Sequence, residues 1–396
     1  MKLDTSLKEL ERQLSLCIKC KQCTYGSWPE NLPACPINDR YKFFTYCGGG
    51  IIYLARGILL GLIEEDDYDE VLDIIIKCTS CQFCGQTCKL VKVAPPYQNV
   101  TDLIRLLKIH LVKKGIYVSD KHKDKIDFVK KNLRPFDVSA EEEKELGLLK
   151  RSVPNKGEVL LFPGCVTSYR NRENLKAVIE MLNMAGVDYQ MEEEECCCGV
   201  PLLDLGNVDG MAGLVDRHLE QMKGMRIRKV VFMCPHCQEA FKEIYPQMAK
   251  KELDFKLMFI TSYLMKLIEE KRLEPLKSVP LKITYHDPCY LGRSLGDFDS
   301  ARGIFNKIPG LQFVEMSRAR EENYCCGAGG GVKTLEPENA MAIGQERTKD
   351  FMKTGSEVLT TSCPHCKSQF RDVNKSISKN FLVKDVVEIL RASLKE

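Results

Sequence analysis

Cys197-Cys198-Gly199 and Cys325-Cys326-Gly327 are two copies of one short sequence, and each lies inside a longer five-cysteine pattern. A single cysteine precedes each doublet by 31 or 35 residues, and a Cys-Pro-His-Cys motif follows it by 35 or 36 residues. The copies begin about 125 residues apart. A repeat at this period indicates that one structural unit occurs twice. The first set is Cys165, Cys197, Cys198, Cys234 and Cys237, and the second is Cys289, Cys325, Cys326, Cys363 and Cys366.

The composition indicates an ordinary globular protein of two or three domains. The chain has 396 residues, 44% hydrophobic and 29% charged, and its net charge of +3 gives no basic excess that would favour nucleic acid. The first residues lead straight into charged sequence, so we expect no signal peptide and a cytoplasmic protein. The longest apolar run, residues 51–63, contains Arg56 and is too short to span a bilayer. Association with a membrane would therefore require a partner protein.

The chain contains 20 cysteines, and the N-terminal ones follow a second pattern. Cysteine triplets at x2-x2 spacing are typical ligands of a [4Fe–4S] cubane, and two such clusters commonly exchange their fourth ligands. Zinc sites and disulfides fit this spacing and compartment less well. We therefore predict two cubanes, the first held by Cys17, Cys20, Cys23 and Cys88, and the second by Cys78, Cys81, Cys84 and Cys35.

Short apolar strands precede the single cysteine and the closing motif in both copies. We expect strands over residues 159–165, 230–234, 283–289 and 358–363, with a helix over 171–186. Strands alternating with helices predict parallel sheets buried on both faces, and ligands of such sheets lie past the carboxyl ends of the strands. The five thiols of a copy can then converge. A helix over 5–16 and a buried helix near 51–63 are expected in the N-terminal part.

Each copy resembles the cysteine-rich CCG domain of heterodisulfide reductases and related iron–sulfur oxidoreductases. Two such domains behind a two-cubane ferredoxin module resemble the D-type subunit of heterodisulfide reductases, which fuses the equivalents of the C-type and B-type subunits. The resemblance implies an α+β multidomain fold and a noncubane [4Fe–4S] cluster on each five-cysteine set, between which a disulfide is cleaved. Gly199, Gly327 and Gly329 would allow close approach of the backbone to the cofactor.

Two cysteines remain outside the four predicted sets. Cys47 fits neither cubane, and we interpret it as a small buried apolar residue. Cys196 precedes the first doublet and makes it a triplet. The spacing to Gly199 favours Cys197 and Cys198 as ligands, and a shift by one residue stays open.

The predicted domains are a helical ferredoxin module at 1–110, a helical linker at 111–156, and CCG domains at 157–278 and 279–396. The predicted function is reduction of a small anionic disulfide, such as the coenzyme M–coenzyme B heterodisulfide. His236, His286 and His365 are candidate proton donors. Basic residues near the second set could bind an anionic substrate, namely Arg293, Arg318, Arg320 and Lys333.

The alternative function is electron relay. CCG domains also occur in electron-transfer subunits that serve flavoprotein dehydrogenases or electron-transfer flavoproteins and pass electrons to a quinone or membrane partner. Many of those lack one closing cysteine, whereas both closing pairs are complete here, which favours disulfide chemistry. The sequence contains no GxGxxG motif, P-loop or flavin signature, so a flavin or NAD would belong to a separate redox partner. That donor could be a cytochrome b, a flavoprotein or a hydrogenase-type protein.

Overall fold

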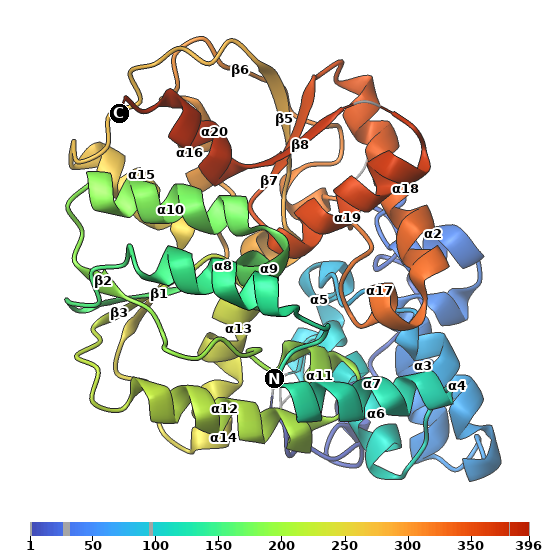
Figure 1. The fold of residues 1–396 in the computed structure, drawn as a ribbon. Helices are drawn as coiled ribbons and strands as arrows, with labels where there is room; N and C mark the ends of the chain where they lie inside the picture. The colour runs from blue at the N-terminus through green and yellow to red at the C-terminus, as the bar shows by residue number, and fades with distance from the viewer. Residues whose placement is uncertain (1, 27–31, 95–97, 380, 396) are drawn as a thin grey trace. The chain divides into compact units, whose positions relative to one another are not determined.

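The computed structural model describes residues 2–26, 32–94, 98–379 and 381–395 (Figure 1). The chain forms two compact units, each assembled from segments that are distant in the sequence. The first unit comprises Met1–Pro135, Gly199–Gly213 and Arg318–Arg347, and the second comprises Phe136–Cys198, Leu214–Ser317 and Thr348–Glu396. The four-part division at 110, 156 and 278 follows the cysteine patterns and stays a prediction.

The first unit is helical in its described residues. Its core forms where α3 and α4 pack against α6, with Ile51, Leu72 and Leu107 buried. The side chain of Asn99 accepts the amide N–H of Asp102 and so caps α6. The helices are α1 (Glu11–Leu14), α2 (Pro36–Tyr41), α3 (Gly48–Leu59), α4 (Tyr68–Ile76), α5 (Phe83–Thr87), α6 (Val100–Lys113), α7 (Asp120–Asn132), α11 (Val200–Asp204) and α17 (Val332–Leu335). Short 3-10 turns are η1 (Phe44–Tyr46), η2 (Glu65–Asp67), η3 (Leu90–Val93) and η5 (Arg320–Glu322).

The expected N-terminal helix is much shorter than predicted. Residues 5–16 contain only α1, Glu11–Leu14. The amide and hydroxyl of Ser6 both donate to the Glu9 carboxylate at 2.7 Å, which closes a separate turn ahead of α1. Leu10 then stands at the N-cap, where its side chain can accept no amide hydrogen bond. The buried helix expected near 51–63 is present as α3.

The second unit contains two four-stranded sheets in which every pair of neighbouring strands is parallel. The strand orders are β2-β1-β3-β4 and β6-β5-β7-β8, so the second sheet repeats the topology of the first. This confirms the predicted α+β fold with repeated parallel sheets. The strands are β1 (Val159–Phe162), β2 (Tyr189–Gln190), β3 (Lys229–Phe232), β4 (Lys256–Phe259), β5 (Lys282–His286), β6 (Gln312–Phe313), β7 (Val358–Thr361) and β8 (Leu382–Asp385).

Helices of the two repeats pack against each other in matching pairs. Helix α10, which follows the first strand of its repeat, packs against α20, which follows the last strand of the other (Figure 1). The equivalent pair, α16 and α15, also packs together. The two repeats therefore meet through equivalent surfaces, as in a twofold arrangement. The helices are α8 (Ala140–Lys150), α9 (Cys165–Arg170), α10 (Arg172–Met184), α13 (Pro235–Glu243), α14 (Tyr245–Ala249), α15 (Ile260–Glu269), α16 (Ser300–Phe305), α19 (Pro364–Ser376) and α20 (Val386–Ser393), with a π-helical turn η4 (Tyr290–Ser294).

Two further helices have residues in both units: α12 (Val208–Met222) and α18 (Pro337–Lys353).

The strands end slightly earlier than predicted, and the cysteines follow them at the start of the next helix. Cys165 is the first residue of α9, three residues beyond β1. Cys234 and Cys363 are the N-caps of α13 and α19, two residues beyond β3 and β7. These cysteines therefore lie at the carboxyl ends of the sheet strands, where parallel sheets bind ligands.

Candidate metal centres

The first predicted cubane set comes together in the first unit. Burial raises the pKa of the Cys17 thiol, and neighbouring thiols raise it further by charge repulsion; these are Cys20, Cys23 and Cys88. The amide of Gly49 donates to the Cys23 sulfur at 3.3 Å. The Tyr53 hydroxyl donates to the Cys17 carbonyl at 3.0 Å. Four clustered sulfurs with a donated amide suit an iron–sulfur cluster, whose potential depends on such hydrogen bonds.

The second predicted set lines one pocket of the first unit. Burial raises the pKa of Cys35, and the nearby thiols raise it further, those of Cys78, Cys81 and Cys84. All four cysteines line the pocket together with Gly48. A Cβ added to Gly48 would lie 2.6 Å from the Cβ of Cys84, so the start of α3 leaves no space for a side chain. The residues present therefore fit the tetrathiolate ligand set of a cubane.

Cys47 lies beside the first cubane set and is not one of its predicted ligands. Its side chain is fully buried, its sulfur is 3.8 Å from that of Cys23, and its thiol donates to the Phe44 carbonyl at 3.1 Å. This environment agrees with the small buried residue expected from the sequence.

All five thiols of the first CCG set lie in the second unit and come together there. Cys197 shares hydrogen bonds with both Cys165 and Cys198, and Cys237 links Cys198 to Cys234. The hydrogen bond with Cys197 raises the pKa of the Cys198 thiol, and burial raises it further. Gly164 has φ +77°, and a Cβ there would lie 2.9 Å from the Cys237 sulfur. A side chain at this position would intrude on the thiol cluster.

The remaining cysteine of the triplet has different partners. The Cys196 sulfur lies 3.2 Å from Nε2 of His218, and Nδ1 of that ring lies 2.8 Å from the Glu192 carboxylate. Nε2 also lies 3.2 Å from the Cys197 carbonyl oxygen. Both His218 and Glu192 are buried. Neither residue belongs to a motif or to the repeated spacing, so the sequence carried no signal that could have found them.

The second CCG set is divided between the two units. Cys289, Cys363 and Cys366 belong to the second unit, whereas Cys325 and Cys326 belong to the first. Burial opposes ionisation of Cys363, but hydrogen bonds with Cys366 and His236 lower the pKa of its thiol to about 6.

The doublet of the second set is held within the first unit. The amide of Gly327 donates to the Cys325 sulfur at 3.3 Å. Gly327 has φ +93°, and a Cβ there would lie 2.5 Å from the carbonyl oxygen of Ala340. Glycine is therefore required immediately after this doublet.

The two Cys-Pro-His-Cys motifs face each other within the second unit. The rings of His236 and His365 meet edge to face with centroids 5.0 Å apart. Each histidine bonds the first cysteine of the opposite motif, His236 to Cys363 and His365 to Cys234. The His236 ring also packs against Tyr290, with ring centroids 3.9 Å apart. Equivalent ends of the two sheets are thus joined at these motifs.

The other predicted residues have individual surroundings. His286 is buried on β5 with its ring against Phe370. Arg318 is buried in the first unit, where it donates to the Pro33 carbonyl and its guanidinium lies 4.2 Å from the centre of the Tyr324 ring. These contacts suit a role of Arg318 in stabilising the fold of the first unit better than a role in binding substrate. The remaining basic candidates, Arg293, Arg320 and Lys333, are half-buried.

Comparison with known proteins agrees with the repeated architecture. A family model described as CCG, cysteine-rich domain, matches residues 159–242 and 283–371. The chain is 30% identical over 393 residues to the D-type subunit of the dihydromethanophenazine:CoB–CoM heterodisulfide reductase of Methanosarcina barkeri, covering 96% of this chain and 94% of that protein. It is also 30% identical over 345 residues to EtfAB:quinone oxidoreductase of Syntrophomonas wolfei, covering 82% of this chain and 47% of that protein.

A solved structure supports the fold. The crystal structure of a hypothetical protein from Helicobacter pylori matches with a TM-score of 0.58 at 13% identity, covering 88% of this chain and 68% of that one. Together, the repeats and the relatives define an iron–sulfur oxidoreductase with two cysteine-rich CCG domains. The chain belongs to the family of the D-type subunits of heterodisulfide reductase. Within the described residues, we find no helix of the length and apolar character needed to cross a membrane.

Proposed function

We propose that this protein passes single electrons through two cubane [4Fe–4S] clusters to a pair of noncubane [4Fe–4S] clusters, where a disulfide is reduced. The cubanes would be held by the sets beginning at Cys17 and Cys35. The noncubane clusters would be held by the five-cysteine sets beginning at Cys165 and Cys289. The observation that carries this proposal is the pairing of two complete Cys-Pro-His-Cys motifs across the two repeats.

Reduction of one disulfide takes two electrons and two protons and gives two thiols. Bound iron–sulfur clusters supply electrons one at a time, so a paired site suits the reaction. In the second unit, the chain holds Cys234 and Cys363 close to the same two histidines, His236 and His365. The absence of a side chain at Gly164 leaves room beside the Cys237 sulfur. These residues thus hold and orient sulfur ligands where the two repeats meet, with His236, His286 and His365 as candidate proton donors.

The test measures turnover and a spectroscopic signal on anaerobically purified, fully loaded protein. With a chemical reductant, it should cleave a small anionic heterodisulfide such as the coenzyme M–coenzyme B disulfide. An oxidised sample given one product thiol should show a new paramagnetic signal as the thiol binds at a CCG site. Cys325→Ala and Cys363→Ala should abolish both effects and leave cubane signals intact. If both variants keep disulfide turnover and the thiol-induced signal, the assignment of the chemistry to the second CCG set is refuted.

The second candidate function is electron relay between a flavoprotein and a quinone or membrane partner. It is favoured by the match to EtfAB:quinone oxidoreductase over 82% of this chain. This function predicts no disulfide turnover and no thiol-induced signal, together with rapid cluster reduction by a reduced flavoprotein. Measuring disulfide turnover, the thiol-induced signal and reduction by a flavoprotein on one loaded sample therefore distinguishes the two functions.

The partners follow from the electron balance. An external redox protein must supply electrons to the N-terminal cubanes, and we propose a cytochrome b, a flavoprotein or a hydrogenase-type protein. We place the protein in the cytoplasm, with any membrane association made through that partner. Co-purification from the native organism tests both points.

A further inference from the structure

A buried lysine lies beside the second cubane pocket. Lys108 on α6 has no exposed surface, and its ammonium donates to the carbonyl oxygens of Gly330 at 3.0 Å and Asp204 at 3.3 Å. Neither acceptor carries a charge. The Asp204 carboxylate is nearby, but the guanidinium of Arg105 also approaches it, at 3.5 Å. A buried cation normally needs a negative partner, and here that carboxylate is shared.

Another ionisable group that interacts with Lys108 is a predicted cluster ligand, Cys78. The Cys78 carbonyl oxygen lies against Gly330, whose own carbonyl accepts from Lys108. On balance burial lowers the pKa of Lys108, although the charges of Cys78 and Asp204 oppose that shift. Lys108 and Cys78 therefore interact electrostatically within the first unit.

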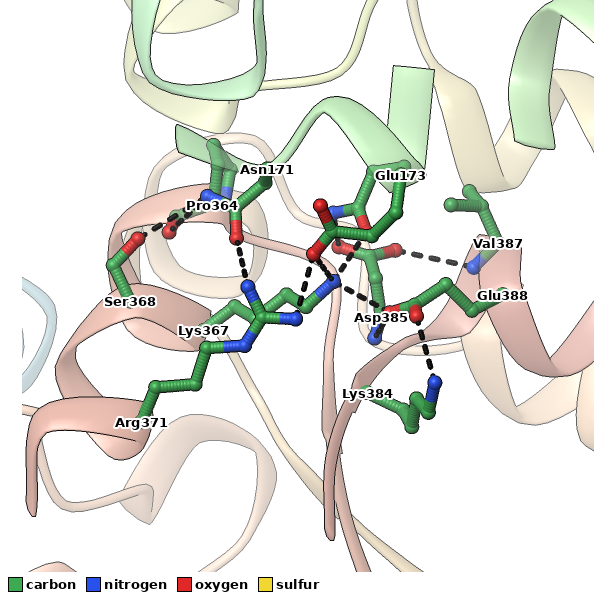
Figure 2. Close-up of polar contacts among 11 residues, drawn as sticks. Asn171, Glu173, Pro364, Lys367, Ser368, Arg371, Lys384, Asp385, Val387 and Glu388 are labelled. Atoms are coloured by element: carbon green, nitrogen blue, oxygen red, sulfur yellow. Dashed lines mark hydrogen bonds and ion pairs between the residues drawn. The ribbon is translucent and has the colours of Figure 1, made fainter. Parts of the chain in front are cut away.

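Lys367 shows how a buried lysine is otherwise accommodated in this protein. It too has no exposed surface, but its ammonium bonds two carboxylates, Glu173 at 2.8 Å and Glu388 at 2.5 Å (Figure 2). The charge of Lys367 is thus balanced by direct ion pairs. Lys108, in contrast, donates to two uncharged carbonyl oxygens, and its charge interacts with both Asp204 and Cys78.

The carbonyl of Gly330 that Lys108 binds belongs to the loop after the Cys325-Cys326 doublet. Gly330 has φ +67°, and a Cβ there would lie 2.1 Å from the Cys78 carbonyl oxygen. The loop backbone is therefore packed directly on the backbone of the second cubane set. From α6, Lys108 holds the Gly330 carbonyl of this loop by its hydrogen bond.

We propose that Lys108 is a positioning and tuning residue of the second cubane site, where its ammonium favours the reduced cluster and holds the Gly330 loop against Cys78. This inference rests on the proposed cubane held by Cys35, Cys78, Cys81 and Cys84. Reduction adds one negative charge to a cluster, and a buried cation lowers the free energy of the more negative state. The proposal gives a redox role to a residue that no cysteine motif marks.

The experiment is an EPR-monitored redox titration of full-length Lys108→Met protein with its iron content matched to the wild type. We expect one cubane to become harder to reduce and the other to keep its potential. The equilibrium constant for electron exchange between the two cubanes should shift about tenfold, which for a one-electron couple corresponds to 59 mV. Lys108→Arg retains the charge and should restore most of the shift.

Two further variants guard against a merely structural effect. Lys77→Met is the matched control, because Lys77 adjoins Cys78 but its ammonium is paired with Asp73 at 2.5 Å, so we expect little change in potential. If Lys108→Met fails to load iron, Asp204→Asn tests the same field with the opposite sign, because removing this negative charge should make the second cubane easier to reduce.

The outcomes separate this inference from the proposed function. Unchanged potentials for both cubanes in fully loaded Lys108→Met or Asp204→Asn protein would overturn the inference alone. Wild-type protein without two cubane signals would overturn the cluster assignment and this inference with it. Wild-type protein with both signals but no disulfide turnover would overturn only the disulfide chemistry, and the tuning by Lys108 would stand.

Discussion

Replacing Lys367 by methionine should weaken the attachment between the two CCG repeats. The Lys367 ammonium, on α19, reaches Glu173 on α10 and Glu388 on α20 (Figure 2). It also donates to the side-chain oxygen of Asn174 at 2.5 Å. The lysine thus ties the second repeat to the first. Methionine retains the apolar stem and removes the charge and its hydrogen bonds.

The magnitude follows from the burial of the two carboxylates. Removing one member of a buried ion pair costs about 3–5 kcal/mol, because the partner charge is left uncompensated. The Glu388 side chain is 12% exposed and experiences most of that cost, which is reduced because the partly exposed Lys384 still bonds it at 3.0 Å. The Glu173 side chain is 41% exposed and keeps Arg371 at 2.6 Å, so its loss is near the roughly 0–1 kcal/mol of a surface pair. We therefore expect a loss of about 3 kcal/mol in the free energy of unfolding.

The pH dependence supplies a second check with a defined sign. Burial would raise the pKa of Glu173, but Lys367 and Arg371 lower it to about 2. Glu173 therefore stabilises the fold above its unfolded pKa of about 4.3, and this stability is lost as pH falls toward 2. Burial raises the pKa of Asp385 to about 7, against the opposing charge of Lys367. The stability from Asp385 is fully present below its unfolded pKa of about 3.9 and is lost as pH rises through about 7.

Lys367 lowers the pKa of three nearby carboxyls, those of Glu173, Asp385 and Glu388. Its removal should raise all three pKa values, so the folded variant retains more protons than the wild type. Its loss of stability relative to wild type should be smaller at about pH 6 than at about pH 8. The measurement is urea unfolding followed by far-UV circular dichroism at both pH values. Lys384→Met is the matched control, since its 41% exposed side chain bonds the same Glu388 at 3.0 Å and should cost under about 1 kcal/mol. A Lys367→Met cost equal to that of this control would refute the reasoning.

The remaining predictions concern cluster content. Fully loaded protein should contain about 16 irons, four for each of four clusters, by anaerobic iron and acid-labile sulfide analysis; about eight irons with stoichiometric zinc would contradict the CCG assignment. Cys47→Ala and Cys196→Ala should keep full iron content and Cys197→Ala should lose one cluster, whereas iron loss in the Cys196 variant alone would mean that the ligand doublet is shifted by one. Gly48→Ala should reduce loading, because its Cβ would lie 2.6 Å from that of a predicted ligand, while Gly147→Ala, with open space around it, should load normally.

The cysteine spacing predicted the architecture well because each cysteine group is tied to an apolar strand. The segments around Val159, Val230, Ile283 and Val358 are short, apolar and followed by helical sequence, and a parallel sheet is the arrangement that buries both of their faces. Both sheets are present with the same strand order. The sequence places the strand ends two or three residues too late, since the cysteines begin the following helices. Spacing reports which residues recur, but it does not report where a strand stops pairing.

The supporting contacts could not be predicted, because they join segments that share no period. The position before each CCG doublet illustrates this. In the first copy it is Cys196, which bonds the buried His218 within the second unit. In the second copy it is Tyr324, whose hydroxyl donates to Asp39 at 3.0 Å within the first unit, beside the N-terminal cysteine segments. The doublets themselves are identical, so the two copies keep the predicted ligands while the residue next to them differs. We infer that the copies are not interchangeable: one doublet is supported inside its own repeat, and the other is supported by the part of the chain expected to deliver electrons.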